Sequence, residues 1–223
     1  MKRMRTLYII GAVLAAIVVG AVFIVASTGL IKIPVITSVF GFDKAPDLGI
    51  QTDPALFSGL LTRQGVTLTD PASNYCLKCD ITYSNPGLME ASLTSSELSS
   101  YLQATNNEKG PLKGIQVRLG DNNQAEMAAY ADLREHGYDF SGPVYAAGRI
   151  EKAGTGSIRL DVQSAKAGLV PIPEGYRKSA EEALEDTIND QLQKMPGLRI
   201  DALDIENGRL NFNGNFPKTA SAR

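Results

Sequence analysis

The pattern of hydrophobic and polar residues begins with an unbroken apolar run at positions 7–26, preceded by Lys2, Arg3 and Arg5. A helix of this length rises about 30 Å, which matches the apolar core of a bilayer. The run therefore predicts a membrane-spanning anchor whose basic end stays in the cytoplasm, with the rest of the chain outside the membrane. A cleaved signal peptide is the alternative, although the exit "VAST" (25–28) is a poor cleavage signal.

Beyond the stalk, alternating apolar and polar residues predict antiparallel strand pairs, because a period of two places one kind of residue on each face. The expected pairs are 115–119 with 124–133, 144–151 with 157–164, and 198–206 with 209–216. The last pair is joined by Asn207-Gly208, which favours a tight hairpin turn. A change of phase between Ala202 and Leu203 predicts a β-bulge.

Two short helices are predicted from their capping residues. Asp53 followed by Pro54 is typical of a helix start, and the apolar spacing that follows continues to about Gln64. The tetrapeptide from Thr94 to Glu97 is a capping box, in which a hydroxyl and a carboxylate satisfy two backbone donors.

One longer amphipathic helix is predicted between "PIP" (171–173) and "PG" (196–197). Its apolar residues recur at three- and four-residue spacing, namely Tyr176, Ala180, Ala183, Leu184, Thr187, Ile188, Leu192 and Met195. Charged residues such as Glu181, Glu185 and Asp186 occupy the remaining positions. We expect this helix to pack lengthwise along the concave face of a bent sheet, with the charged side in solvent.

The predicted fold is α+β: an N-terminal transmembrane helix, then a strongly curved antiparallel sheet wrapped around one long amphipathic helix. Residues 1–30 form the cytoplasmic start and anchor, and residues 31–47 a membrane-proximal stalk with scattered Gly and Pro. An extracytoplasmic domain follows at 48–217. The polar tail at 218–223 is predicted to be disordered.

The composition argues against two classes of function. Hydrophobic residues make up 43% of the chain and charged residues 21%, with a net charge of −2, so a nucleic-acid partner is not expected. His136 is the single histidine, and no G-x-S-x-G elbow is present. Asp121-Asn122-Asn123 lacks the spacing of a calcium loop and predicts a turn. We therefore predict no enzymatic activity, no metal and no cofactor.

Cys76 and Cys79 are the two cysteines of the chain and form a C-x-x-C. A thioredoxin-like site would need a helix beginning at the first cysteine, whereas the following residues "DITY" (80–83) are typical of a strand. A zinc site would need about four ligands. The pair is therefore predicted to form a local disulfide, with two unpaired thiols as the alternative.

Several short stretches carry a resemblance to a known family: "LTSSELSSYL" (93–102), "GLVPIP" (168–173) and the hairpin "GLRIDALDIENGRLNFNG" (197–214). Over residues 91–216 the chain resembles the YpmS-type small single-pass bacterial membrane proteins, which are related to the tubular lipid-binding (TULIP) superfamily. Residues 50–90 match nothing in that family. The resemblance implies a TULIP-like curled sheet around a long helix and an apolar groove for lipid acyl chains.

The residues expected to line this groove come from the middle strands and the long helix: Met127, Ala129, Val144, Ala146, Ile158, Leu160, Ala183, Leu184, Ile188 and Leu192. Several are small, which permits either a tightly closed core or space for a ligand. The predicted function is a lipid-binding or lipid-handling module anchored in the cell membrane. A non-enzymatic scaffold with a filled core, binding an envelope protein, is the alternative.

Overall fold

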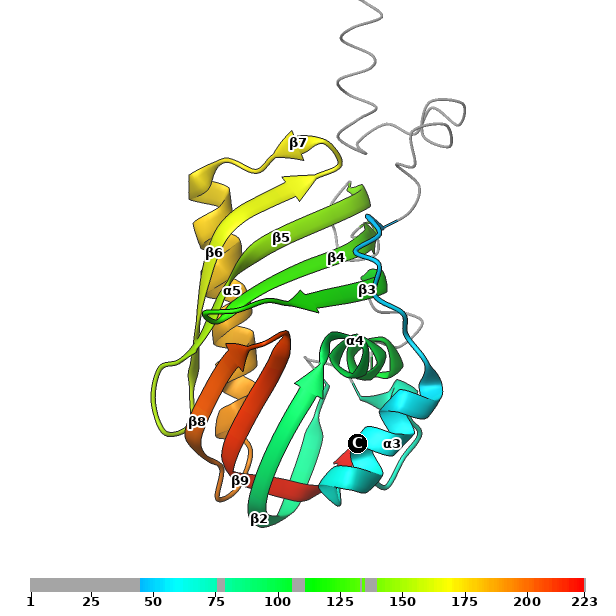
Figure 1. Cartoon of the computed structure of the whole chain (residues 1–223), viewed down its shortest axis with the longest axis vertical. Helices are drawn as coiled ribbons and strands as arrows, with labels where there is room; N and C mark the ends of the chain where they lie inside the picture. Colours follow the sequence, from blue (N-terminus) through cyan, green and yellow to red (C-terminus); the bar gives the residue numbers. More distant parts are fainter. Residues whose placement is uncertain (1–44, 76–78, 106–110, 133, 135–139, 223) are drawn as a thin grey trace, which may run out of the picture.

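The computed structural model describes residues 45–75, 79–105, 111–132, 134 and 140–222 (Figure 1). Within these residues the fold is α+β, with three α-helices and mostly antiparallel strands arranged in two sheets, neither of which closes into a barrel. No helix in this part of the chain is long and apolar enough to cross a membrane. The anchor predicted at 7–26 lies outside the described residues.

A five-stranded antiparallel sheet forms the upper half of Figure 1. Its strands, in spatial order, are β3 (Leu112–Leu119), β4 (Gln124–Asp132), β5 (Ser141–Lys152), β6 (Ile158–Ala167) and β7 (Val170–Pro171). The first two predicted strand pairs are therefore confirmed as neighbours β3–β4 and β5–β6. β5 and β6 shift register between Ala147 and Gly148, which marks a bulge.

A four-stranded sheet forms the lower half, and β9 (Arg209–Ala222) is its central strand. β2 (Ile81–Thr94) pairs with β9 along its length. On the other side β9 pairs with β8 (Arg199–Glu206) and, in parallel, with β1 (Thr67–Leu68). The predicted β8–β9 hairpin is confirmed, and its register shift lies between Ile200 and Ala202, close to the predicted bulge.

The prediction of a disordered tail at 218–223 was wrong for residues 218–222, which form the end of β9. Thr219 pairs with Thr67 of β1 and Ala220 pairs with Tyr83 of β2. The Ala220 carbonyl also accepts a hydrogen bond of 2.8 Å from the Tyr75 hydroxyl. Backbone pairing with two neighbours orders a segment whose polar composition gave no sign of a strand.

The helices begin where their caps predicted. α3 (Pro54–Gln64) is capped by Asp53, whose Oδ1 accepts from the Ala55 N–H at 2.8 Å. α4 (Ser95–Ala104) has the complete capping box between Thr94 and Glu97. α5 (Glu174–Gln193) follows Pro173, and a short 3₁₀ helix, η1, spans Ala72–Asn74.

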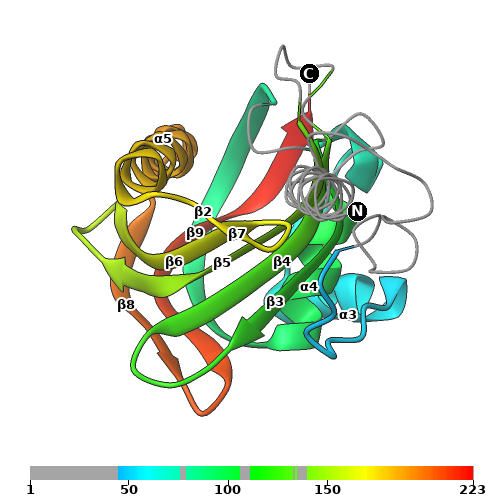
Figure 2. The ribbon, with the colours of Figure 1, turned by 90° about the horizontal axis from the view of Figure 1, so that it is seen from above.

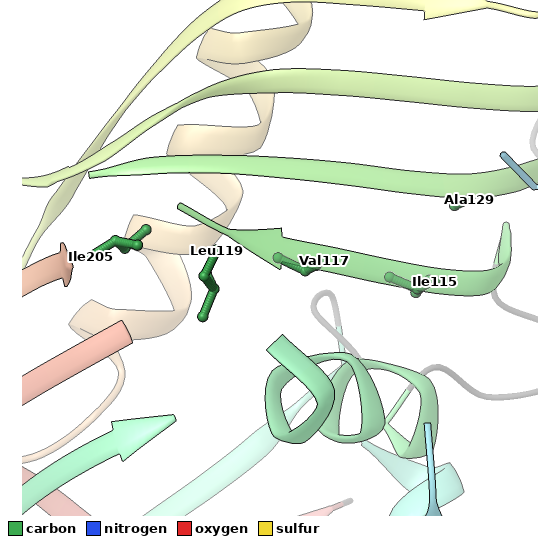
Figure 3. Close-up of a cluster of buried hydrophobic side chains, with 5 residues drawn as sticks. All are labelled: Ile115, Val117, Leu119, Ala129 and Ile205. Carbon is green, nitrogen blue, oxygen red and sulfur yellow. The ribbon is translucent and has the colours of Figure 1, made fainter. Parts of the chain in front are cut away.

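The hydrophobic core lies between the two sheets and α4, where one continuous sheet had been expected. Its buried residues are Ile115, Val117, Leu119, Ala129 and Ile205 (Figure 3). Leu98 and Leu102 of α4 and Leu210 of β9 pack against them, while no α5 residue belongs to this cluster. Asn123 joins the sheets, because its Oδ1 accepts from the Ile205 N–H at 2.8 Å and its own N–H donates to the Ile205 carbonyl at 3.0 Å.

α5 runs past both sheets on one side of the molecule and lies beside β6 (Figures 1 and 2). Its main contacts among the described elements are with that strand. The expectation that the sheet wraps around this helix is therefore corrected: α5 follows the free edge of β6.

Candidate functional site

The six strand residues predicted to line a groove share one face of the five-stranded sheet. β4 and β5 pair Met127 with Ala146 and Ala129 with Val144, and directly paired residues of antiparallel strands point to the same side. β6 adds Ile158 and Leu160 on that side, since Leu160 pairs with Ile150 of β5, which packs on the core cluster. We call the surface formed by Met127, Ala129, Val144, Ala146, Ile158 and Leu160 the inner face.

The inner face is only partly covered. Ala129 is fully buried and Leu160 is 8% exposed, whereas the other four residues remain half-buried. Small residues share the face by register, namely Ala125, Ala131, Gly148, Ala165 and Ala167. The inner face thus combines small and larger apolar side chains, and it is incompletely covered.

Gly148 is required because the backbone of β6 lies very close to it. A Cβ built on this glycine would lie 2.2 Å from the Asp161 carbonyl oxygen and 2.8 Å from the Val162 Cα. Both are backbone atoms of the paired strand, so no side-chain adjustment relieves the overlap. The glycine therefore permits the bulge, and the bulge keeps the apolar side chains before and after it on the same face.

The opposite face of the same sheet is polar. Arg118 donates two hydrogen bonds to the carboxylate of Glu126, at 3.2 and 2.8 Å, and the Tyr145 hydroxyl donates to the same carboxylate at 2.7 Å. The hydrogen bonds from Arg118 and Tyr145 hold the pKa of Glu126 below its ordinary value. The sheet thus separates a mostly polar side, on which Ala128 is also buried, from the apolar inner face.

The four-stranded sheet adds apolar residues that the sequence reasoning missed. β2 places Met89, Ala91 and Leu93 on the side that carries Phe212 and Phe216 of β9, whose rings meet edge to face with centroids 5.9 Å apart. A usable signal existed, because Met89, Ala91 and Leu93 alternate with Glu90 and Ser92. In this region a strand is predicted from the sequence only over "DITY" (80–83), at the beginning of β2, and without a partner strand.

α5 docks on the sheet through polar side chains. The backbone N–H groups of Ile158, Leu160 and Val162 donate to the side chains of Asn189, Glu185 and Glu181, respectively, at 2.9, 2.8 and 2.5 Å. Four helical residues rise about 6 Å and two strand residues about 6.6 Å, so the two repeats match along the edge. The helix thereby closes the unpaired edge of β6 as a neighbouring strand would.

This docking corrects the predicted orientation of the helix. Glu181 and Glu185, expected in solvent, are half-buried against β6. Of the groove candidates on the helix, Ala183 is exposed and Leu184 is 39% exposed, while Ile188 and Leu192 are half-buried. Unpaired backbone groups at a sheet edge need hydrogen-bond partners. The helix is therefore rotated so that its polar residues, rather than its apolar stripe, bond the edge of β6.

α4 closes the other edge of the five-stranded sheet in the same way. The Val117 N–H donates to the Ser99 hydroxyl oxygen at 2.8 Å, and that hydroxyl donates to the Val117 carbonyl at 3.3 Å. The Leu119 N–H donates to Ser95 Oγ at 3.0 Å. The edge strand β3 and the part of β6 that β7 leaves unpaired are therefore each covered by a helix whose side chains, four residues apart, bond the strand backbone.

α3 and α4 are tied by one ion pair. Arg63 Nη1 lies 2.7 Å from Glu97 Oε1, while Glu97 Oε2 accepts from the Thr94 N–H at 2.8 Å. Burial acts to raise the pKa of Glu97, but the hydrogen bonds from Arg63 and Thr94 outweigh it and lower the pKa below its ordinary value. The contacts of Glu97 with Thr94 hold the start of α4, and its contact with Arg63 holds α3 against α4, which marks this carboxylate as structural.

A depression of about 680 Å³ lies against the four-stranded sheet, away from the groove predicted from the sequence. A chain of hydrogen bonds crosses its floor from Ser92 to Asn211 at 2.7 Å and from Asn211 to Asp204 at 2.8 Å. Its lining is mostly polar: Arg63, Gln64, Glu90, Ala91, Ser92, Ala202, Asp204, Arg209, Asn211, Phe212 and Asn213. This polar surface does not suit acyl chains as ligands.

Cys79 is disulfide-bonded. Cys76 lies outside the described residues, so the predicted pairing of the two stays a prediction. Cys79 is linked to α5, since Gln191 Nε2 donates to the Cys79 carbonyl at 3.2 Å. Gln191 is 7% exposed, and its Oε1 is buried without a hydrogen-bond partner among the described residues.

The described part of the chain holds no group of three or more His, Cys, Asp or Glu side chains that could bind a metal ion. His136 lies outside it, so the absence of enzymatic activity stays a prediction. No protein-family model matches the chain, and no curated protein matches it. The resemblance to YpmS-type and TULIP proteins therefore rests on the sequence stretches alone.

Proposed function

We propose that this chain is a lipid-binding or lipid-handling module of the cell envelope, anchored in the cell membrane by the apolar run at 7–26, with its N-terminus in the cytoplasm. Its domain lies outside the membrane and holds acyl chains against the inner face. In this proposal the two curved sheets and α5 are an open variant of the TULIP-like arrangement, in which the helix borders the groove.

One observation carries the proposal: the inner face is apolar, contains many small residues and is incompletely covered. Met127, Val144, Ala146 and Ile158 remain half-buried. α5 is attached to β6 through the side chains of Glu181, Glu185 and Asn189, and its apolar residues Ile188 and Leu192 remain half-buried as well. Acyl chains would complete this packing.

The proposed mechanism is passive and needs no cofactor. Each buried methylene contributes about 0.8 kcal/mol, so a short stretch of acyl chain on the inner face provides useful affinity. The head group stays in water. Small side chains such as Ala146 provide the space, and a larger side chain at that position would fill it.

The full-length protein in vesicles provides the test. The vesicles contain a phospholipid with a photoactivatable group on its acyl chain, and labelled peptides are mapped after illumination. We expect label in the peptides of β4, β5 and β6. Ala146→Phe, on the inner face, should remove most of it, whereas Ala147→Phe, the next residue on the opposite face, should retain it. Equal labelling in both folded variants would refute acyl-chain binding at this face.

The second candidate is a scaffold domain that binds an envelope protein. The packing of Val117, Ala129 and Ile205 favours it, since these core residues are nearly or fully buried between the sheets and α4. A filled core predicts label in the membrane anchor and none in β4, β5 or β6. The same experiment therefore separates the two functions.

A further inference from the structure

Exposed apolar side chains gather where the chain leaves β6 and enters α5. Leu169 is 60% exposed and Tyr176 is 75% exposed, and Pro171 and Pro173 are exposed between them. We call residues 166–178 the β7 ridge. It forms the upper end of the described fold in Figure 1 and faces the viewer in Figure 2.

The exposure of the ridge comes from a well-held turn. The Gly168 N–H donates to the Pro143 carbonyl at 2.8 Å, and the Ile172 N–H donates to the Ala165 carbonyl at 2.9 Å. Pro171 lies on the outermost strand, where it offers no N–H to a further strand. Leu169 is thus exposed on a hydrogen-bonded turn, and Pro171 hinders the pairing of a further strand.

The ridge is also basic. It contains Lys166, Arg177 and Lys178 against Glu174, a formal charge of 3 − 1 = +2, whereas the whole chain carries −2. Lys178 pairs with Glu174 at 3.3 Å, and Lys166 Nζ lies 5.9 Å from the centroid of the Tyr145 ring, so the excess positive charge is on Lys166 and Arg177. Exposed leucine, tyrosine and basic side chains together are typical of segments that lie in the head-group region of a bilayer.

The tether is long enough for the ridge to reach the bilayer that holds the anchor. The predicted membrane span ends at Ala26, and the described chain begins at Ala45, beside Gly114 of β3. The residues between, 27–44, reach at most about 60 Å when fully extended. β3 and β7 are the opposite outer strands of one sheet, about 19 Å apart at roughly 4.8 Å per strand, so this reach spans the distance from the tether to the ridge.

We propose that the β7 ridge lies on the bilayer that holds the N-terminal anchor. Leu169 enters the boundary between head groups and acyl chains, the Tyr176 ring lies at the interface, and Lys166 and Arg177 face lipid phosphates. This contact rests on the proposed anchoring and is independent of acyl-chain binding at the inner face. It fixes the orientation of the domain on the membrane.

Tryptophan fluorescence tests the contact directly, because the chain contains no tryptophan. Leu169→Trp therefore introduces a single probe in the full-length protein, which is reconstituted in vesicles containing anionic phospholipid and lipids brominated near the head-group end of the acyl chain. Leu88→Trp is the matched control, since Leu88 is 80% exposed on β2 of the other sheet. We expect Leu169→Trp to lose most of its emission to bromine quenching and Leu88→Trp to retain it.

Absence of quenching at Leu169→Trp, or equal quenching at both positions, overturns the proposal. Sedimentation of the same samples after an alkaline wash tests anchoring separately. Protein that stays with the vesicles but shows no quenching refutes the ridge contact alone, whereas protein that is washed off refutes the anchor and the contact together. Vesicles without anionic lipid should reduce the quenching, because Lys166 and Arg177 then lose their anionic head groups. Quenching that does not depend on anionic lipid overturns their part in the contact.

Discussion

Asn189 of α5 forms two hydrogen bonds with the backbone of one strand residue, Ile158. The Ile158 N–H donates to Asn189 Oδ1 at 2.9 Å, and Asn189 Nδ2 donates to the Ile158 carbonyl at 3.0 Å. The amide of Asn189 thereby replaces the backbone of a neighbouring strand. Glu185 and Glu181 accept from the next two N–H groups along the edge, those of Leu160 and Val162. An ionised carboxylate accepts hydrogen bonds but does not donate them.

This difference predicts the effect of changes at Glu185. Glu185→Gln keeps the acceptor for the Leu160 N–H and adds a donor for the Leu160 carbonyl, so this variant should be at least as stable as the wild type. Glu185→Ala removes the partner of that N–H and should cost about 1–2 kcal/mol. Hydrogen exchange at the Leu160 amide is the measurement, with exposed Glu182→Ala as the control. Equal exchange in the Ala and Gln variants would contradict the docking geometry.

A second prediction concerns Ser99 at the opposite edge. Ser99 is fully buried and bonds both backbone groups of Val117. Ser99→Ala leaves a buried N–H and a buried carbonyl without a side-chain partner, and should lower the free energy of unfolding by about 1–3 kcal/mol. Urea unfolding measures the change. Ser96→Ala, at a half-buried position on the same helix, should have a much smaller effect.

Gly148 and Gly156 form a matched pair for a third prediction. A Cβ at Gly148 would overlap the Asp161 backbone, whereas a Cβ at Gly156 meets no atom within 4 Å. Gly148→Ala should destabilise the domain by about 1–3 kcal/mol or more, because the paired strand must shift. Gly156→Ala should be close to neutral. If both variants unfold at the wild-type denaturant concentration, the close approach of β5 and β6 is wrong.

The Glu97 carboxylate gives the fourth prediction, on pH. Its pKa is lowered in the folded state, so its contribution to stability is fully present above its unfolded value, about 4.3, and is lost as the pH falls through the lower folded value. Glu97→Gln should therefore be less stable than the wild type at pH 7, and the difference should shrink below about pH 4. Denaturant unfolding of both proteins at several pH values measures it. A difference that is constant with pH would exclude the charge as its cause.

Local features of the fold were readable in the sequence because they depend on neighbouring residues. Asp53 and the capping box at Thr94 start their helices as predicted, since a cap needs only residues within one turn. The β8–β9 hairpin turns at Asn207-Gly208, where both residues adopt positive φ. Register within that hairpin then follows from the turn. The six strand candidates lie on β4, β5 and β6 and share one face because side chains alternate along each strand.

What the tertiary structure decided is how these elements meet. Residues 218–222 become strand because β1 and β2 lie on either side of β9, and no pattern within that segment reports a partner more than a hundred residues away. α5 turns Glu181, Glu185 and Asn189 toward the sheet because β6 presents unpaired N–H groups there. The sequence determined an amphipathic helix, but an apolar stripe indicates only which side of a helix hydrophobic packing would bury. Which side of the helix docks depended on the backbone donors of a distant strand edge, and these exist only once the sheet has formed.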